Sequence, residues 1–259
     1  HDILFFIITR DNKGYFFHTN HHNRSSHPLQ CHILYDRVNA MQARHSFLAI
    51  IFLLFFISGA AGLIYQIVWT RALVLVFGST TNTIVAVIAA FLGGLAVGSL
   101  IWGSRADKKK EIAALLRLYA YLEGGVGISA LISFPLLTFL IPFYQIFNDG
   151  AEVTTGLLII KFFFAIGIIL IPTILMGGTL PVLVNIAQRC RNHLEKNVSI
   201  LYAVNTFGAV VGTMSAGFIL LELAGLRGSL FIAAGLNLLA AFAALTMASR
   251  LIGQNIVAE

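Results

Sequence analysis

The sequence is poor in charged residues. Its 259 residues include 17 Lys and Arg and 11 Asp and Glu, so that 11% of the side chains are charged while 58% are hydrophobic. Soluble domains carry about 25% charged residues. A water-soluble fold cannot cover this much apolar surface with so few charges. The composition therefore excludes soluble enzymes and disordered tails, and it predicts an integral membrane protein.

The chain also has few cysteines and none of the usual catalytic motifs. Cys31 and Cys190 form no C-x-x-C pair and no zinc pattern, so we expect neither a disulfide framework nor a metal site. The sequence contains no Walker loop, no H-E-x-x-H and no dinucleotide-binding glycine motif after a strand. It accordingly predicts no catalytic residues and no cofactor.

Residues 1–40 differ in composition from the rest. Seven of the eight histidines lie at or before His45, but their spacings do not repeat and no acidic residues are organised around them, which disfavours a metal-binding tract. Met41 precedes a short polar stretch and a long apolar one, as a cytosolic start would. We expect residues 1–40 to be a poorly ordered, non-native extension. Residues 41–250 are predicted to form the membrane domain, and residues 251–259 a cytoplasmic tail.

A membrane span needs about 20 apolar residues. Six stretches meet this requirement, and the sequence therefore predicts an all-α, six-helix transmembrane bundle. The stretches are 47–69, 83–102, 112–134, 155–175, 199–224 and 228–248. The shorter apolar stretch 136–147 contains Pro142 and is expected to be interfacial or re-entrant.

The orientation follows from the basic residues of the short loops, because cytoplasmic loops are enriched in Lys and Arg. The loops after the second and fourth spans hold seven basic residues, whereas the alternate loops hold Arg71 and Arg227. This asymmetry predicts a multi-pass protein of the inner (plasma) membrane with both termini in the cytoplasm. The net charge of +6 is thereby explained by topology, and we expect no nucleic-acid partner.

The fourth span does not end cleanly. Apolar residues continue to Ala187, and a straight helix from 155 to 187 would be about 50 Å long. A kink or break is favoured by Pro172, Gly177, Gly178, Thr179 and Pro181. Broken helices can line binding cavities in membranes. The alternative is a helix that kinks and continues along the cytoplasmic interface.

Two pairs of glycines have the spacing that lets helices approach closely in lipid. They are Gly94 with Gly98 in the second span and Gly208 with Gly212 in the fifth. Both pairs are related by an offset of 114 residues. This offset is either coincidental or the sign of two three-helix repeats, which build the halves of some transporters.

Glu123 is the best-placed ionisable residue, because it lies about eleven residues into the third span, beside Gly124 and Gly125. Ionisable residues at membrane depth are costly and mark functional sites. The alternative is a structural carboxyl that pins helix packing. Asn205 and Asn237 are expected to bridge helices or to line a site, and Gln66 and Tyr65 are further candidates for an intramembrane site. The alternative for Tyr65, together with Trp69, is an interfacial aromatic belt.

Several runs of residues follow one another in a recognisable order. They are Ser58–Arg71, Phe77–Thr81, Ala90–Ser99, Gly103–Asp107, Pro172–Pro181 and Leu201–Ala209. In this order they resemble the membrane-embedded spermidine synthase-like family, over residues 47–248. The resemblance implies a transmembrane part similar to a major-facilitator half, joined in the family to a polyamine aminopropyltransferase domain.

Two departures limit what the resemblance implies. The family usually has Glu where this chain has Gln66, so a carboxylate that would bind a cation there is absent. The sequence given ends at Glu259, about where the family's soluble catalytic domain would begin. We therefore expect spermidine synthase activity only if such a domain, or a soluble aminopropyltransferase partner, is present.

Three functional hypotheses remain open from the sequence. The first is the membrane domain of a spermidine synthase-like protein, which acts as an anchor and as a carrier of polyamines or small cations. The second is a stand-alone transporter half that works as a homodimer. The third is a membrane scaffold that transports nothing.

Overall fold

The computed structural model describes residues 5–8, 14–17, 27–77, 81–147, 155–190 and 194–257. The chain divides into two compact units, His1–Phe47 and Leu48–Glu259. In the first unit, β1 (Phe5–Ile8) pairs with β2 (Gly14–Phe17) in antiparallel register, with Phe5 opposite Phe17. Helix α1 already begins at His27. The interpretation of residues 1–40 as a poorly ordered, non-native extension stays a prediction.

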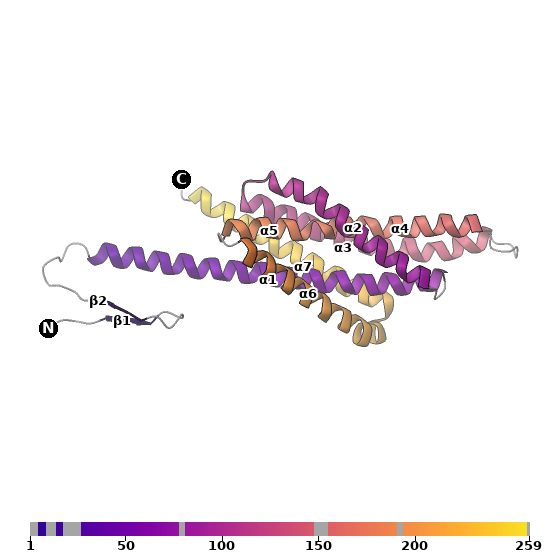
Figure 1. Ribbon diagram of the computed structural model, residues 1–259, viewed down its shortest axis with the longest axis horizontal. Helices are drawn as coiled ribbons and strands as arrows, with labels where there is room; N and C mark the ends of the chain where they lie inside the picture. Colours follow the sequence, from indigo (N-terminus) through magenta and orange to yellow (C-terminus); the bar gives the residue numbers. More distant parts are fainter. Residues whose placement is uncertain are drawn as a thin grey trace. The chain divides into compact units, whose positions relative to one another are not determined.

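The described part of the second unit is helical (Figure 1). Its elements are the part of α1 (His27–Phe77) from Leu48 onward, α2 (Thr81–Asp107), α3 (Ile112–Phe147), α4 (Thr155–Gly177), α5 (Thr179–Cys190), α6 (Leu194–Ser215), the π-helix η1 (Ala216–Leu220) and α7 (Leu221–Val257). The stretch 136–147, expected to be interfacial or re-entrant, is instead the continuation of α3. Helical hydrogen bonding thus continues past the end of the predicted third span at residue 134.

Five helical stretches of the described residues are long and apolar enough to cross a membrane. They are Ser46–Leu75, Thr83–Asp107, Ile112–Phe139, Phe163–Arg189 and Val198–Leu251. The last is 54 residues long and contains both the fifth and the sixth predicted spans. Within it, Gly225 has a non-helical backbone with φ 66° and ψ −172°. Figure 1 shows α6 and the greater part of α7 running in opposite directions.

Large apolar side chains are exposed along several of these helices. Leu100 on α2 is 77% exposed, Phe218 on η1 73% and Leu223 on α7 83%. Large apolar side chains exposed in such number are unusual on soluble monomers, whereas lipid tails cover them without cost. The exposed surface and the composition of the helices therefore both indicate a membrane protein.

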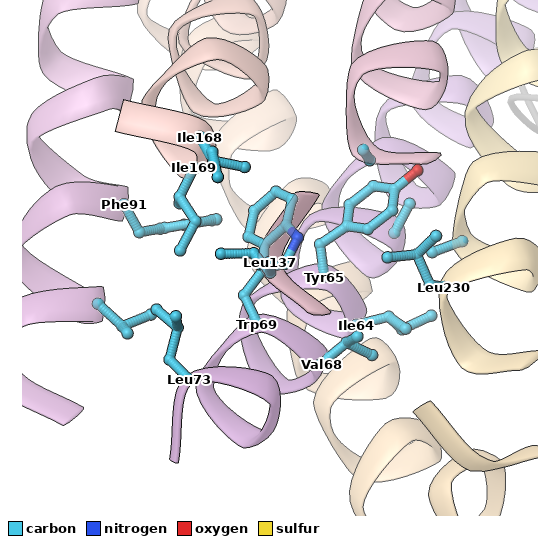
Figure 2. Packing of buried hydrophobic residues seen from close by; sticks show 14 of the residues in the cluster. Ile64, Tyr65, Val68, Trp69, Leu73, Phe91, Leu137, Ile168, Ile169 and Leu230 are labelled. Carbon is cyan, nitrogen blue, oxygen red and sulfur yellow. The ribbon is translucent and has the colours of Figure 1, made fainter. Parts of the chain in front are cut away.

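The interior is packed around two aromatic rings of α1 (Figure 2). Tyr65 and Trp69 are fully buried and stacked, with ring centroids 5.4 Å apart. The indole Nε1 of Trp69 donates a 2.9 Å hydrogen bond to Ser133 Oγ on α3. The expected aromatic belt at the membrane interface is therefore wrong for these two residues. Spacing of four places them on one face of a helix, but it does not say which face is buried.

Glycines bring α2 and α4 into backbone contact. A Cβ atom at Gly98 would collide with the carbonyl oxygen of Ile174, and one at Gly94 with the Thr173 side chain. Gly177 meets α2 in return, because a Cβ there would collide with the carbonyl oxygen of Leu95. We call this the α2–α4 contact.

Helices α1 and α6 meet in the same manner. A Cβ atom at Gly208 would collide with the carbonyl oxygen of Phe56, and one at Gly212 with that of Ala60. We call this the α1–α6 contact. The two contacts and the packing of α3 on α7 assemble the helices around the buried centre.

The Gly225 backbone gives the first testable prediction. Its φ of 66° and ψ of −172° fall in a region that is essentially restricted to glycine, and non-glycine residues there cost about 1–3 kcal/mol. We expect Gly225→Ala to lower the free energy of unfolding in detergent by this amount, although a Cβ there meets open space. Gly217→Ala is the control, because its Cβ also meets open space while its φ is negative. Equal stability of the two variants would contradict the glycine-restricted backbone conformation at Gly225.

Candidate functional site

A buried carboxyl and a buried amide meet between α3 and α7. Glu123 is 0% exposed and Asn237 is 1% exposed. The side-chain Nδ2 of Asn237 donates a hydrogen bond of 2.5 Å to Glu123 Oε2. Glu123 lies near the middle of the apolar stretch Ile112–Phe139. Both residues lie on the faces through which α3 and α7 pack against each other. We call them the Glu123–Asn237 pair.

Three hydroxyl groups surround this pair. The side chains of Ser58 and Tyr119 approach the Glu123 carboxyl without forming a hydrogen bond to its Oε1 atom, and the buried hydroxyl of Tyr65 lies in the same region. The Tyr119 hydroxyl donates its one hydrogen to the backbone carbonyl oxygen of Leu54, at 3.3 Å. The site thus combines residues of α1, α3 and α7.

The hydrogen bonding of the pair is incomplete. Within the part of the chain that the structure describes, Glu123 Oε1, Asn237 Oδ1 and the Tyr65 hydroxyl have no hydrogen-bond partner. Buried polar atoms without partners cost about 1–3 kcal/mol each, and an unpaired buried carboxylate costs more. The open oxygens are one oxygen of the Glu123 carboxyl and the amide oxygen of Asn237. Together they favour a ligand group that carries positive charge or N–H donors.

The other polar residues predicted from the sequence lie at different places. Asn205 is half-buried on α6, where its Oδ1 would be 2.7 Å from a Cβ atom at Gly59 of α1. Gln66 is half-buried on α1, and its backbone carbonyl oxygen accepts a 2.7 Å hydrogen bond from Thr70 Oγ1. Tyr65 is the member of this group that approaches the Glu123 carboxyl.

The predicted break in the fourth span falls at Gly178. Helix α4 ends at Gly177 and α5 begins at Thr179, while Pro172 lies inside α4. The polar groups at the break bond locally: Gly178 N donates to Leu175 O at 3.1 Å, and Thr179 Oγ1 donates to Met176 O at 2.8 Å. Gly178 also lies against the Trp102 side chain, and Gly103 is within reach of the Pro181 ring. At the break between α4 and α5, the chain therefore packs closely against α2.

Ser58 and Tyr119 were missed as site residues by the sequence analysis. Tyr119 precedes Glu123 by four residues, and this spacing places the two on one face of α3, so a signal was present. Ser58 lies on a different helix, and its approach to Glu123 depends on how α1 packs against α3. No three His, Cys, Asp or Glu side chains cluster among the described residues, and the side chains of the histidine-rich residues 18–32 lie outside them.

No protein-family model, no curated protein and no solved structure matches this chain. The resemblance to the spermidine synthase-like family therefore remains a prediction from its motifs.

The pair gives a prediction about stability. Asn237→Ala removes the donor that Glu123 Oε2 accepts from, and leaving a buried acceptor unpaired costs about 1–3 kcal/mol. We expect this loss in the free energy of unfolding, measured by denaturant titration in detergent.

The matched control replaces both partners with apolar residues of similar size. We expect the double variant Glu123→Leu with Asn237→Leu to lose less stability than Asn237→Ala, because it leaves neither an unpaired carboxyl nor an unpaired amide at this position. A larger loss in the double variant would contradict the view that the unpaired carboxyl carries the cost.

Proposed function

We propose that this chain is a six-span membrane domain whose Glu123–Asn237 pair binds a small cation or one ammonium group of a polyamine, so that the domain acts as a carrier. In this proposal it is the membrane part of a spermidine synthase-like protein, with both termini in the cytoplasm of an inner (plasma) membrane. Aminopropyl transfer would require a catalytic domain or a soluble partner. The observation that carries the proposal is the incompletely bonded carboxyl in the centre of the bundle.

The charge of the site supports a singly charged ligand group. Glu123 is the one ionisable carboxylate of the group, and Asn237, Ser58, Tyr65 and Tyr119 contribute neutral oxygens. An ammonium group offers up to three N–H donors, and Glu123 Oε1 and Asn237 Oδ1 are acceptors without partners in the described residues. A cation placed there would neutralise the buried carboxylate and satisfy both acceptors.

The stacked Tyr65 and Trp69 rings are consistent with this chemistry. Their aromatic faces lie in the same buried region as the Tyr65 hydroxyl. Cations interact favourably with such faces when they are desolvated. A scaffold that binds nothing would have no use for an open acceptor in its core, since such a group destabilises the fold.

Six crossings require the chain to turn back at Gly225. A straight 54-residue stretch would be about 80 Å long, far more than the roughly 30 Å of bilayer hydrocarbon. A turn at Gly225, with its non-helical backbone, divides it into two helices of suitable length. The proposal therefore places Gly225 at the outer surface and the 105–110 loop in the cytoplasm.

Cysteine accessibility tests this topology. With Cys31 and Cys190 replaced by serine, we expect Ala224→Cys to react with a membrane-impermeant maleimide added from outside. Lys108→Cys is the matched control, and it should react only after the membrane is opened or inverted. Both side chains are exposed, so burial does not limit either reaction. Labelling of both positions from the same side would rule out six crossings.

Replacement of the carboxylate tests the binding site. We expect Glu123→Gln, which keeps the shape of the side chain and removes its charge, to abolish spermidine uptake into proteoliposomes and the rise in melting temperature that methylammonium produces. Glu222→Gln is the matched control, because it makes the same chemical change at an exposed position on α7. Unchanged uptake in Glu123→Gln would refute the assigned role, and loss in both variants would show a nonspecific effect.

A further inference from the structure

The Glu123–Asn237 pair has a property that neither residue shows alone. The two residues that form the hydrogen bond are 114 residues apart. The same offset relates Gly94 to Gly208 and Gly98 to Gly212. Suppose that two halves of a chain are related by a twofold rotation and that equivalent residues differ by a fixed offset in number. Two equivalent residues that contact each other must then lie near the rotation axis.

The glycine contacts test this relation in three dimensions. Gly98 contacts the carbonyl oxygen of Ile174, and Gly212 contacts that of Ala60. Ala60 and Ile174 are themselves 114 residues apart. The contact of Gly98 with Ile174 and the contact of Gly212 with Ala60 are therefore equivalent in both of their partners. A chance match between two glycine motifs would not fix the positions of the residues that they contact.

The boundaries of the helices follow nearly the same offset. Helices α1 and α5 end at Phe77 and Cys190, and α2 and α6 begin at Thr81 and Leu194, so that both pairs are 113 residues apart. Gly225, the non-helical residue of the last stretch, corresponds to Glu111, which lies in the non-helical connection between α2 and α3. The axis exchanges α3 with the part of α7 after Gly225, and these two segments pack against each other.

We infer that residues 46–139 and 163–251 form two equivalent repeats, that the Glu123–Asn237 pair lies on the axis between them, and that Asn237 is the residue that limits the site to one negative charge. The inference rests on the proposed cation site. Three crossings per repeat make the two repeats opposite in orientation. Because Glu123 and Asn237 both lie on the axis, both side chains contact the same ligand. This holds whether position 123 or position 237 carries the carboxylate.

This arrangement makes a specific statement about the ligand. With one carboxylate and one amide, the pair matches a single positive charge. With two carboxylates, the same position would match a divalent cation, because the affinity of an oxygen site for calcium rises with its number of charged ligands. Because Asn237 is neutral, the site selects a singly charged group over a divalent cation.

Two substitutions that preserve shape allow an experiment with four proteins. Glu123→Gln removes the charge, Asn237→Asp adds one, and the double variant moves the single charge across the axis without changing either side-chain outline. The readout is the rise in melting temperature of the purified protein as methylammonium or calcium chloride is added, because a ligand that binds the folded state stabilises it.

The expected results differ for each protein. The native chain should be stabilised by methylammonium, and Glu123→Gln should lose this stabilisation. The double variant Glu123→Gln with Asn237→Asp should regain it, with half-maximal stabilisation within about tenfold of the native concentration, which corresponds to about 1.4 kcal/mol. Asn237→Asp alone should be half-maximally stabilised by calcium at a concentration at least about tenfold lower than the native chain requires.

The outcomes separate this inference from the proposed function. If methylammonium and spermidine fail to stabilise the native chain, the proposed cation site is wrong. If the native chain responds and the double variant does not, the positions are not equivalent and the inference is overturned. If Asn237→Asp gains no response to calcium, Asn237 does not set the charge of the site. If Asn237→Asp unfolds without calcium and folds with it, the result supports the inference, because two unneutralised carboxylates repel each other.

Discussion

The hydrogen bond from Asn237 to Glu123 joins α3 to α7 where no water covers either side chain. A carboxyl in such a place is tolerated only if polar groups surround it, because an unpaired buried charge is among the most expensive features of a fold. The amide of α7 and the hydroxyls of Ser58, Tyr65 and Tyr119 meet part of this requirement. The remaining open acceptors distinguish the pair from an ordinary bridge between helices.

The approach of α1 to this pair depends on contacts made elsewhere. Backbone contact at Gly208 and Gly212 fixes α1 against α6, and contact at Gly94 and Gly98 fixes α2 against α4. With the hydrophobic effect largely absent between helices in lipid, close packing of this kind supplies much of the attraction. The stacked Tyr65 and Trp69 rings then fill the centre, and the Trp69 bond to Ser133 connects α1 to α3.

The repeat relation that we infer accounts for these features together. Gly98 and Gly212 make equivalent contacts, and the same offset of 114 residues separates Glu123 from Asn237. The two repeats are not identical at this point, since one supplies a carboxylate and the other an amide. A functional difference between two otherwise equivalent positions is a more specific clue to the ligand than a buried carboxylate alone.

The sequence by itself determined the class of protein, the approximate positions of the helices, the glycines with close-contact spacing and the place of Glu123 inside an apolar helix. Each of these depends on local composition or on spacing along one helix. The tertiary structure decided that Asn237 is the partner of Glu123, that Ser58 and Tyr119 lie close to its carboxyl, and that Tyr65 and Trp69 are buried in the protein. It also decided that α3 continues through the stretch 136–147. These facts depend on which faces of different helices meet, and periodicity along one helix carries no information about the face of another.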